Sequence, residues 1–405
     1  CALYCIIIVH MARNITTGID IGTYQVKVIV TEHGKNWNGN LPKIIGTGFA
    51  QSKGLRHCYI INQNDTVRSI QTAVAQAEKS AGIKIKKAFI SIGGVGLEEV
   101  NSRGSAVVAR ADSEITDLDI EKAIKDSEKK VAQKIINRKI LHEIPLQYKI
   151  DGQKVLGKPQ GMRGSKIELD VLFITCLEQH LNDLITSVEE AGIVVEDVMA
   201  SPLAGSFVTL SRAQKVAGSV LANIGAETVS IVVFENNIPI SLKIFSIGGT
   251  DITNDIALGL KIPLDQAERV KTGALSGAEF PKKKLDEIVG ARLTDIFELI
   301  EAHLKKIGKN GLLPAGITIT GGGSGIATIE DLARAALKLP SKTFAGFSNG
   351  NNGSSAVQGL VRDSSWAVAY GLCIWGLSTE EDSIGVKLAK NTGGNIIQWI
   401  KQFLP

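Results

Sequence analysis

The 405-residue sequence lacks a long apolar run, a strong excess of positive charge and closely spaced cysteines. These absences argue against a membrane-spanning helix, nucleic-acid binding and a zinc site. The chain contains no run of eighteen apolar residues, the length that a membrane-crossing helix needs. Its 45 Lys+Arg against 41 Asp+Glu give a formal net charge of +4, which is too balanced to predict nucleic-acid binding. Its five cysteines show neither Cys-x-x-Cys spacing nor a dense framework, so we expect reduced thiols and neither disulfides nor a zinc site.

The composition is that of a large globular protein, with 44% hydrophobic and 21% charged residues. A chain of this length can bury two or more cores, so several subdomains are expected. The apolar stretch 3–9 is short and lacks a basic flank and a clear cleavage site, so we interpret Met11 as the natural start and residues 1–11 as a leader or upstream extension. A short signal peptide is the alternative.

A weak internal duplication organises the chain. Residues 18–30 and 221–233 align with Gly22 on Gly225 and Val26 on Val229. Each copy has the pattern of a buried strand, a tight glycine turn and a returning strand. Such a turn directs several backbone N–H groups at one point, which is a geometry that binds phosphate. Either copy alone would be an ordinary turn, but a matched pair predicts two hairpins that hold one polyphosphate.

A third motif lies further along the chain. Residues 317–325 form a β-branched strand that ends in a glycine cluster, and residues 326–337 follow with a helical pattern. Glycine has no Cβ, so a flat ring or a phosphate can approach its backbone closely. The position of this cluster after the second hairpin favours a nucleotide site.

These motifs resemble those of the superfamily of actin, sugar kinases and DnaK-type chaperones, which implies bound ATP and Mg²⁺. The resemblance places the phosphate-1 motif at Asp20, Gly22, Thr23, Tyr24 and Gln25, the phosphate-2 motif at Gly225, Ala226, Glu227 and Thr228, and the adenosine motif at Gly321, Gly322, Gly323 and Ser324. It assigns ribose contacts to Glu268 and Lys271. It assigns Mg²⁺ to Asp20 and, through water, to Asn223.

Narrower stretches resemble the FtsA family of cell-division proteins. They are residues 140–153, which are the most specific, with 159–164, Leu169 and 245–257. The resemblance runs from about Thr17 to the final residue. A PilM-like pilus-assembly ATPase of the same fold is the alternative, and a superfamily kinase is a further one. His142, within the specific stretch, is expected to be a packed residue without a chemical role.

The family resemblance implies an α/β, actin-like fold of two lobes, built from duplicated ribonuclease-H-like domains with an inserted FtsA-type subdomain. The expected divisions are a first lobe core (1A) at 12–87 and 173–200, rejoined by 367–377, an insert (1C) at 88–172, a second lobe core (2A) at 201–247 and 316–366, subdomain 2B at 248–315, a linker at 378–393, and an amphipathic helix at 394–405.

The last segment has the pattern of an interfacial helix. Its apolar side chains recur at helical spacing, with Lys401 pointing away from them. The side chains expected to enter a membrane are Ile396, Ile397, Trp399, Ile400, Phe403 and Leu404. A helix this short needs a surface to order it, so we predict binding to an anionic bilayer. A terminal helix docked on its own core is the alternative.

The family also implies partners and a location. Arg292 interrupts an apolar stripe on a predicted helix at 285–307, and FtsA-like proteins use a corresponding Arg for the acidic C-terminal peptide of the tubulin-like protein FtsZ. The alternative is that Arg292 has no binding role and lies on a core helix with its charged end extended to solvent. Self-association into filaments through 1C and 2B is implied, on the cytoplasmic side of the membrane at the division site. No nucleic-acid partner is expected.

Three departures from the superfamily pattern predict at most slow ATP hydrolysis. Asn223 stands where an Asp is usual, Ser201 precedes Pro202 where actin-like ATPases have a Glu, and Glu227 adds a carboxylate to the phosphate-2 turn. That carboxylate would either repel the γ-phosphate or turn outward. The alternative is that Glu196, Asp197 or a bound partner replaces the missing groups. No catalytic residue is therefore assigned.

Overall fold

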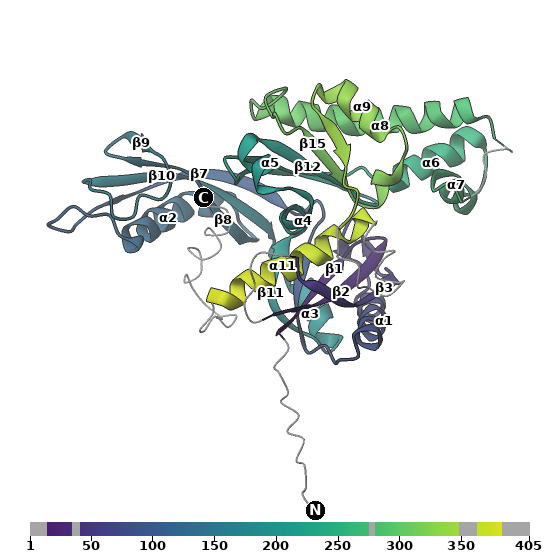
Figure 1. Ribbon diagram of the computed structural model, residues 1–405, viewed down its shortest axis with the longest axis horizontal. Coiled ribbons are helices and arrows are strands. Elements are labelled where there is room, and N and C mark those ends of the chain that lie inside the picture. Colours follow the sequence, from purple (N-terminus) through teal and green to yellow (C-terminus); the bar gives the residue numbers. More distant parts are fainter. Residues whose placement is uncertain (1–13, 35–40, 275–279, 348–362, 383–405) are drawn as a thin grey trace, which may run out of the picture.

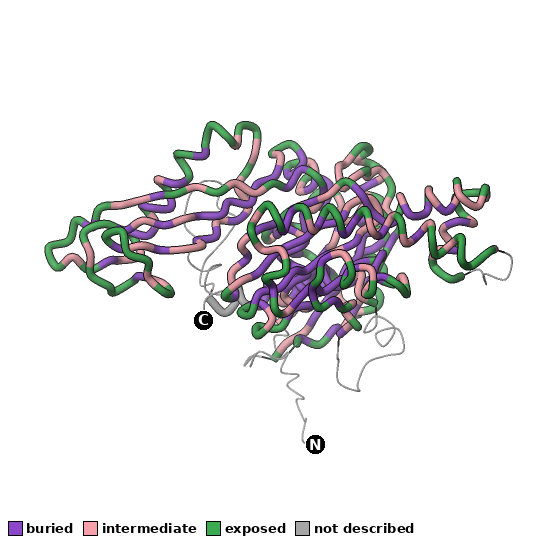
Figure 2. Tube along the Cα trace, turned by 90° about the horizontal axis from the view of Figure 1, so that it is seen from above, coloured by how far each residue is buried: buried purple, intermediate pink, exposed green. Residues whose placement is uncertain are grey.

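The computed structural model describes residues 14–34, 41–274, 280–347 and 363–382. They form two lobes, with an insert of long strands that extends away from them to the left in Figure 1. Figure 2 shows that buried residues fill the two lobes and alternate with exposed ones along the insert. Within the described residues, no helix is both long and apolar enough to cross a membrane.

The first lobe is a five-stranded sheet in the order β11-β6-β1-β2-β3. Its central strands are apolar on both faces, as expected for strands covered by helices on both sides. Helices α1 and α3 pack beside this sheet. Helix α1 ends at Ala81 and is capped by Gly82, whose left-handed φ of 68° is accessible to glycine because glycine has no Cβ. The elements are β1 (Asn14–Ile21), β2 (Gln25–His33), β3 (Lys43–Gln51), β6 (Lys87–Ile92), β11 (Val194–Ala200), α1 (Gln63–Ala81) and α3 (Glu178–Glu190).

The second lobe repeats this arrangement. Its five-stranded sheet has the order β14-β13-β12-β15-β16, so an antiparallel meander is again followed by two parallel strands. The strands are β12 (Ser219–Ile224), β13 (Val229–Glu235), β14 (Ile238–Phe245), β15 (Ile317–Thr320) and β16 (Ser341–Thr343). The repeated order is the structural counterpart of the duplication in the sequence.

The insert is a four-stranded sheet in the order β7-β10-β8-β9, with one helix packed on it. Its own core includes Ile120, Ile124 and Phe173, all nearly inaccessible to solvent. Burial of each such side chain contributes about 1.5–3 kcal/mol. The elements are β7 (Glu98–Val107), α2 (Asp117–Val131), the 3-10 helix η1 (Ala132–Lys134), β8 (Arg138–Ile150), β9 (Gln153–Val155) and β10 (Lys166–Leu177).

Helices cover the rest of the second lobe and join it to the first. Helices α4 and α11 pack against each other between the lobes. Their backbones approach closely, because a Cβ on Gly371 of α11 would clash with the Ala204 carbonyl oxygen of α4. The helices are α4 (Ser201–Thr209), α5 (Arg212–Ala217), α6 (Gly249–Leu260), α7 (Leu264–Lys271), α8 (Lys282–Lys306), η3 (Gly322–Gly325), α9 (Ile329–Leu337), η4 (Ser364–Trp366) and α11 (Ala367–Asp382).

The structure corrects three boundaries. Residues 173–177 were expected in the first lobe, but β10 continues to Leu177 and pairs there with β7 and β8 of the insert sheet. Residues 89–92 were expected in the insert, but β6 pairs with β1 and β11 in the first-lobe sheet, because its apolar side chains are buried among those strands. The linker was expected from residue 378, but α11 continues to Asp382. The expected leader at 1–11 and the amphipathic helix at 394–405 lie outside the described residues.

Candidate functional site

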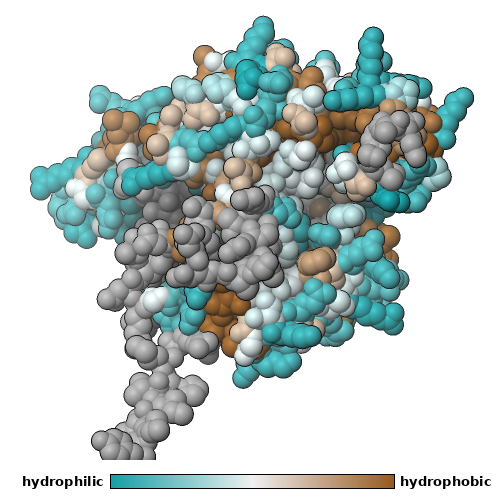
Figure 3. All heavy atoms as spheres, turned by 45° about the vertical axis from the view of Figure 1, so that its right-hand side comes forward, coloured by the Kyte–Doolittle hydropathy of each residue, from teal (hydrophilic) through white to brown (hydrophobic). Residues whose placement is uncertain are grey.

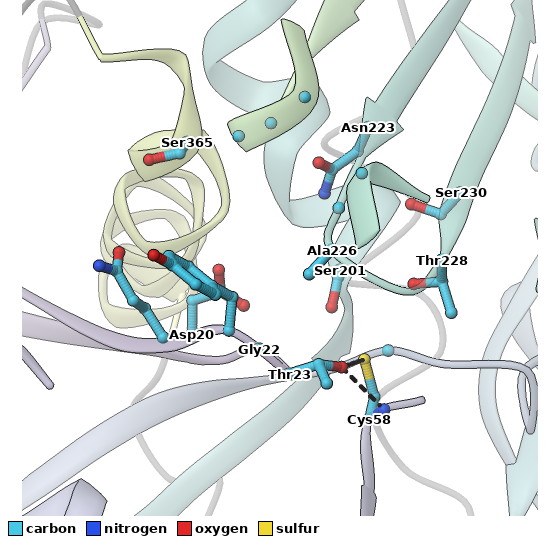
Figure 4. Close-up of a pocket in the computed structure, with 18 of the residues that line it drawn as sticks. Asp20, Gly22, Thr23, Cys58, Ser201, Asn223, Ala226, Thr228, Ser230 and Ser365 are labelled. Carbon is cyan, nitrogen blue, oxygen red and sulfur yellow. Dashed lines mark hydrogen bonds between the residues drawn. The ribbon is translucent and has the colours of Figure 1, made fainter. Parts of the chain in front are cut away.

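A cavity lies between the lobes where the two matched hairpins face each other. It gathers most of the predicted residues: Asp20, Gly22, Thr23, Tyr24, Gln25, Asn223, Gly225, Ala226, Thr228, Glu268, Lys271, Gly321, Gly322 and Gly323. Glu227 and Ser324 do not line it. In Figure 4, Asp20 and Gly22 lie on one side of this cavity, and Asn223 and Ala226 on the other.

The two turns have the same backbone geometry. The Gly22 amide donates to the Gln25 carbonyl oxygen at 3.2 Å, and the Gly225 amide donates to that of Thr228 at 2.9 Å. The flanking strands pair in the same register on both sides. Two short turns thus bring their backbones to one cavity from opposite lobes, which suits a polyphosphate.

The side chains beside the turns differ between the lobes. In the first hairpin Asp20 lies opposite Lys27 across the strands, and in the second Asn223 lies opposite Ser230. Burial raises the pKa of Asp20, and the nearby Lys27 opposes this effect. Burial likewise lowers the pKa of Lys27 against the opposing effect of Asp20. Only the first hairpin therefore carries a buried pair of ionisable groups.

Each member of this pair has a further polar partner. The Ser91 hydroxyl donates to Asp20 Oδ1 at 2.7 Å. Lys27 Nζ donates to the Ser365 hydroxyl at 2.7 Å and to its carbonyl oxygen at 3.1 Å. These bonds fix both charges at the cavity wall.

The glycine cluster lines the cavity beside the second hairpin. Gly321 has a φ of 92°, and a Cβ there would lie 2.3 Å from Asn223 Oδ1. Gly322 faces open space, since a Cβ would meet nothing within 4 Å. The Ser324 hydroxyl, which does not line the cavity, donates to the Gly321 carbonyl oxygen at 2.7 Å and stabilises the turn of the cluster. A flat ring could therefore lie against Gly322.

The predicted ribose residues belong to one polar network. Lys271 Nζ lies 2.7 Å from Glu268 Oε2 and donates to the Gly249 carbonyl oxygen at 2.9 Å. The Thr253 hydroxyl donates to Glu268 Oε2 at 2.5 Å. This network ties α6 to α7 beside the cavity and places a carboxylate where sugar hydroxyls could bind.

Several lining residues were missed by the sequence analysis. Lys27 could have been found, because the hairpin register places it opposite Asp20. The others were not assigned to the site, although Ser230 lies in the second hairpin and Ser201, Gly249 and Thr250 lie in stretches that the sequence analysis had singled out for other reasons. They include Cys58, Gly93, Gly94, Ser201, Ser230, Gly249, Thr250 and Ser365.

The cavity offers few groups that could act as a base. Among the described lining residues the only carboxylates are Asp20 and Glu268, and both are already hydrogen-bonded. Ser201 lines the cavity, but its hydroxyl donates to the Ile92 carbonyl oxygen at 3.0 Å. Glu196 pairs with Lys87 at 2.6 Å, and neither it nor Asp197 lines the cavity.

The oxygen donors of Asp20 and Asn223 suit Mg²⁺, which prefers oxygen ligands and keeps several waters. Ser91 donates to one carboxylate oxygen of Asp20, so the other oxygen would be the one available to an ion or to a water bound to it. In the part of the chain that the structure describes, no three His, Cys, Asp or Glu residues are grouped to hold a metal. These residues therefore fit an ion that enters with phosphate and water.

Two other singled-out residues lie away from the cavity. Arg292 on α8 forms a two-pronged ion pair with Asp255 on α6, with Nε–Oδ2 at 2.6 Å and Nη2–Oδ1 at 3.0 Å. His142 in the insert is buried, and its Nε2 accepts a hydrogen bond from the Ala200 amide at 3.1 Å. Burial lowers the pKa of His142 to about 3, so it is a neutral acceptor at the base of the insert.

Two family models match the chain. One is described as "Cell division protein FtsA" and covers residues 220–371. The other is described as "SHS2 domain inserted in FTSA" and covers residues 96–175. The second match coincides with most of the four-stranded insert.

Curated relatives agree with these models. The cell division protein FtsA of Pseudomonas aeruginosa is 30% identical over 396 residues, covering 92% of this chain and 91% of that protein. FtsA of Bacillus subtilis is 30% identical over 347 residues, covering 80% of this chain and 77% of that protein.

Solved structures resemble the chain in fold. A PilM-PilN type IV pilus biogenesis complex matches with a TM-score of 0.67 at 16% identity, over 89% of this chain and 98% of that chain. MreB 5 of Spiroplasma citri bound to AMPPNP matches with a TM-score of 0.50 at 12% identity, over 91% and 97%. The predicted actin-like fold of two lobes with an insert is confirmed.

Proposed function

This chain belongs to the FtsA family of cell-division proteins, and we propose that it binds ATP with Mg²⁺ between its lobes and links FtsZ filaments to the cytoplasmic face of the membrane at the division site. The observation that carries the proposal is the meeting of two matched phosphate hairpins and a glycine cluster at one cavity. The alternative, a PilM-like pilus-assembly ATPase, is supported only by a similar fold at 16% sequence identity. We favour the FtsA function because curated FtsA relatives are 30% identical in sequence.

We propose a role for each group of residues that lines the cavity. The amides of the two turns would hold the polyphosphate, and Asp20 and Asn223 would hold Mg²⁺, which neutralises phosphate charge. Glu268 and Lys271 would meet the ribose, and the purine would lie against Gly322. Lys27, fixed by Ser365, adds a positive charge at the wall of the first lobe.

The ATP assignment is tested by filling the space above the glycine cluster. Gly322→Val should abolish measurable ATP binding in calorimetry, because the side chain projects into the cavity without a clash that would disturb the fold. Gly325→Val is the matched control, since Gly325 also faces open space but does not line the cavity. Wild-type affinity in Gly322→Val would contradict the assignment.

We propose that bound ATP is hydrolysed slowly, because the described cavity wall holds no carboxylate free to activate water. Occupancy by ATP would then control self-association through 1C and 2B. Single-turnover hydrolysis on lipid with FtsZ present should leave ATP intact over minutes. A rate on the order of 1 s⁻¹, the lower end of ordinary enzymes, would refute this.

The proposed FtsZ contact is on subdomain 2B. Arg292 is about 29% exposed in its side chain and already paired with Asp255, so an acidic peptide would share or replace that carboxylate. Exposed Leu258, Leu264 and Leu299 lie on the same group of helices. Figure 3 shows hydrophobic surface between hydrophilic side chains in the upper, second-lobe part of the molecule, as a peptide-binding face requires.

Charge reversal tests this contact. Arg292→Glu should abolish binding of the FtsZ C-terminal peptide in fluorescence anisotropy. Lys305→Glu, on the same helix and paired within it to Glu301, is the control that should retain binding. Unchanged peptide binding in a folded Arg292→Glu protein would show that the contact lies elsewhere.

The proposed membrane contact rests on the apolar pattern of residues 396–404. Its net affinity should be weak for one molecule and stronger in a filament, where many copies bind together. Trp399→Glu should abolish pelleting with anionic liposomes. Gln398→Glu adds the same charge on the polar side of the expected helix and should retain much of the pelleting. Full pelleting of Trp399→Glu would assign lipid binding to another surface.

A further inference from the structure

The turn of the second phosphate hairpin carries a carboxylate that faces away from the cavity. Its neighbours Ala226 and Thr228 line the cavity, whereas Glu227 does not. The carboxylate accepts a hydrogen bond from the backbone amide of His57, which belongs to the other lobe. At the equivalent position of the first hairpin, Tyr24 lines the cavity and is 57% exposed. The two turns therefore use this position differently.

His57 lies at the tip of a small hairpin in the first lobe, formed by β4 (Leu55–Arg56) and β5 (Tyr59–Ile60). Both residues of the tip have left-handed backbones, with φ of 49° at His57 and 67° at Cys58. This is the geometry of a tight two-residue turn, which normally selects Asn and Gly. Residues that lack this preference keep such a conformation only where their surroundings hold it.

The tip is held from three sides. The Cys58 amide donates to the Thr23 hydroxyl at 3.0 Å, and its thiol lies 3.4 Å from the same oxygen, as the dashed lines of Figure 4 show. The tip also packs on Gly94, where a Cβ would lie 2.4 Å from the His57 carbonyl oxygen. Glu227 is the third contact, and it comes from the opposite lobe. The tip thus connects the first phosphate turn to the second.

The imidazole adds to this contact only weakly. His57 Nδ1 is 3.8 Å from the Glu227 carboxylate, which is beyond hydrogen-bond distance. This nitrogen is buried and has no hydrogen-bond partner among the described residues. The backbone amide is therefore the main donor, and a bond from an amide to a charged carboxylate is stronger than one between neutral groups.

We propose that Glu227 and the His57 amide form a latch between the two lobes beside the cavity, and that breaking this latch limits the release of nucleotide. Helices α4 and α11 pack against each other where the lobes meet. An opening that pivots at these helices would separate the two phosphate turns. The tip stays with the first turn through Thr23, and the bond to Glu227 must then break. The effect on nucleotide rests on the proposed ATP binding, while the latch itself does not.

The latch is tested first in the protein without added nucleotide. Glu227→Ala should speed hydrogen exchange of the His57 amide by about tenfold, followed within the peptide covering residues 52–62, because this amide loses its acceptor. Glu227→Gln keeps an acceptor oxygen without the charge and should restore part of the protection. Glu235→Ala removes a carboxylate from β13, the strand that follows the turn of Glu227. Glu235 pairs there with Lys309, so this variant should change nothing at the tip.

Nucleotide release is measured next, from the dissociation rate of a fluorescent ATP analogue in stopped flow. Glu227→Ala should release it about tenfold faster, equivalent to about 1.4 kcal/mol. Glu227→Gln should lie between this variant and wild type. His57→Asn keeps the amide and tolerates the left-handed backbone, so its rate should change less than about twofold.

The two measurements separate the possible failures. Unchanged exchange at 52–62 in Glu227→Ala would overturn the latch. Faster exchange with slower nucleotide release would also overturn its proposed role, because it would show that Glu227 repels phosphate. If the wild-type protein binds no analogue, the proposed ATP function fails, and the exchange result still decides whether the latch exists.

Discussion

The two lobes share one sheet order but differ in the chemistry beside their phosphate turns. The first lobe places an acid and a base, Asp20 and Lys27, opposite each other across its hairpin. The second places two neutral side chains, Asn223 and Ser230, at the same positions. A duplicated backbone can therefore keep two matched turns while only one copy keeps the ionisable pair. In the proposed function, the first lobe would then be the main holder of the metal, and the second would contribute mainly its backbone.

The largest expected effect comes from removing one member of the charged pair. Lys27→Met should lower the free energy of unfolding by about 3 kcal/mol, because Asp20 would lose the positive charge that opposes its desolvation. Ser230→Ala, at the equivalent position, should change it by less than about 1 kcal/mol. Urea unfolding followed by tryptophan fluorescence measures both.

A double variant sharpens this result. Adding Asp20→Asn to Lys27→Met should recover part of the lost stability, because no buried carboxylate is then left without its partner. Equal losses in Lys27→Met and Ser230→Ala would show that the pair does not distinguish the lobes.

The helices that join the lobes provide a second comparison. A Cβ on Gly371 of α11 would lie 1.8 Å from the Ala204 carbonyl oxygen, whereas on Gly205 of α4 it would make ordinary contacts at 3.7 Å. Gly371→Ala should therefore destabilise the protein by about 2 kcal/mol, and Gly205→Ala should be neutral or stabilise it by up to about 1 kcal/mol. Thermal unfolding measures both, and similar shifts of the two variants would contradict the close approach.

The sequence predicted the duplication because both hairpins repeat the same local pattern, with Gly22 and Gly225 in matched turns. It also predicted the glycine cluster after β15. These features are local, since each depends on a strand and a turn within about ten residues.

The features it missed depend on contacts between distant segments. Two orientations of Glu227 were left open, because the choice depends on the amide of His57, 170 residues away in the chain. The ion pair of Arg292 with Asp255 joins two helices, and no helical periodicity reveals it. Strand β6 was assigned to the insert, because an apolar run of residues predicts a strand but does not indicate which sheet the strand joins. Pairing across the fold decides each of these.

Buried ionisable groups should make the two lobes respond to pH in opposite directions. Burial raises the pKa of Glu143, in the insert of the first lobe, to about 7. The folded state then holds this proton more tightly than the unfolded chain, so its contribution to stability falls between pH 4.5 and about 7. Burial lowers the pKa of Lys215 in the second lobe to about 7, so its contribution rises from there to pH 10.5.

Paired variants isolate these contributions. The stability of Glu143→Gln relative to wild type should increase by about 2 kcal/mol from about pH 5 to about pH 8. The advantage of Lys215→Met should be largest at about pH 7 and should shrink toward about pH 9. Urea unfolding at each pH measures both. Parallel profiles for the variants and wild type would show that neither group titrates with folding.

The smallest expected effect comes from making the second hairpin more like the first. Asn223→Asp is nearly isosteric, so it should keep the packing of this side chain against Gly321. The new carboxylate would lie opposite Ser230 and not opposite a lysine, so its charge would remain available to a cation at the cavity. The ratio of ATP affinity with Mg²⁺ to that without it should therefore rise about fivefold, or about 1 kcal/mol. Titration calorimetry with and without the metal measures this ratio. Asp20→Asn is the converse variant and should lower the ratio. An unchanged ratio in Asn223→Asp would mean that the second lobe does not face the metal, and that the chemical difference between the hairpins has another cause.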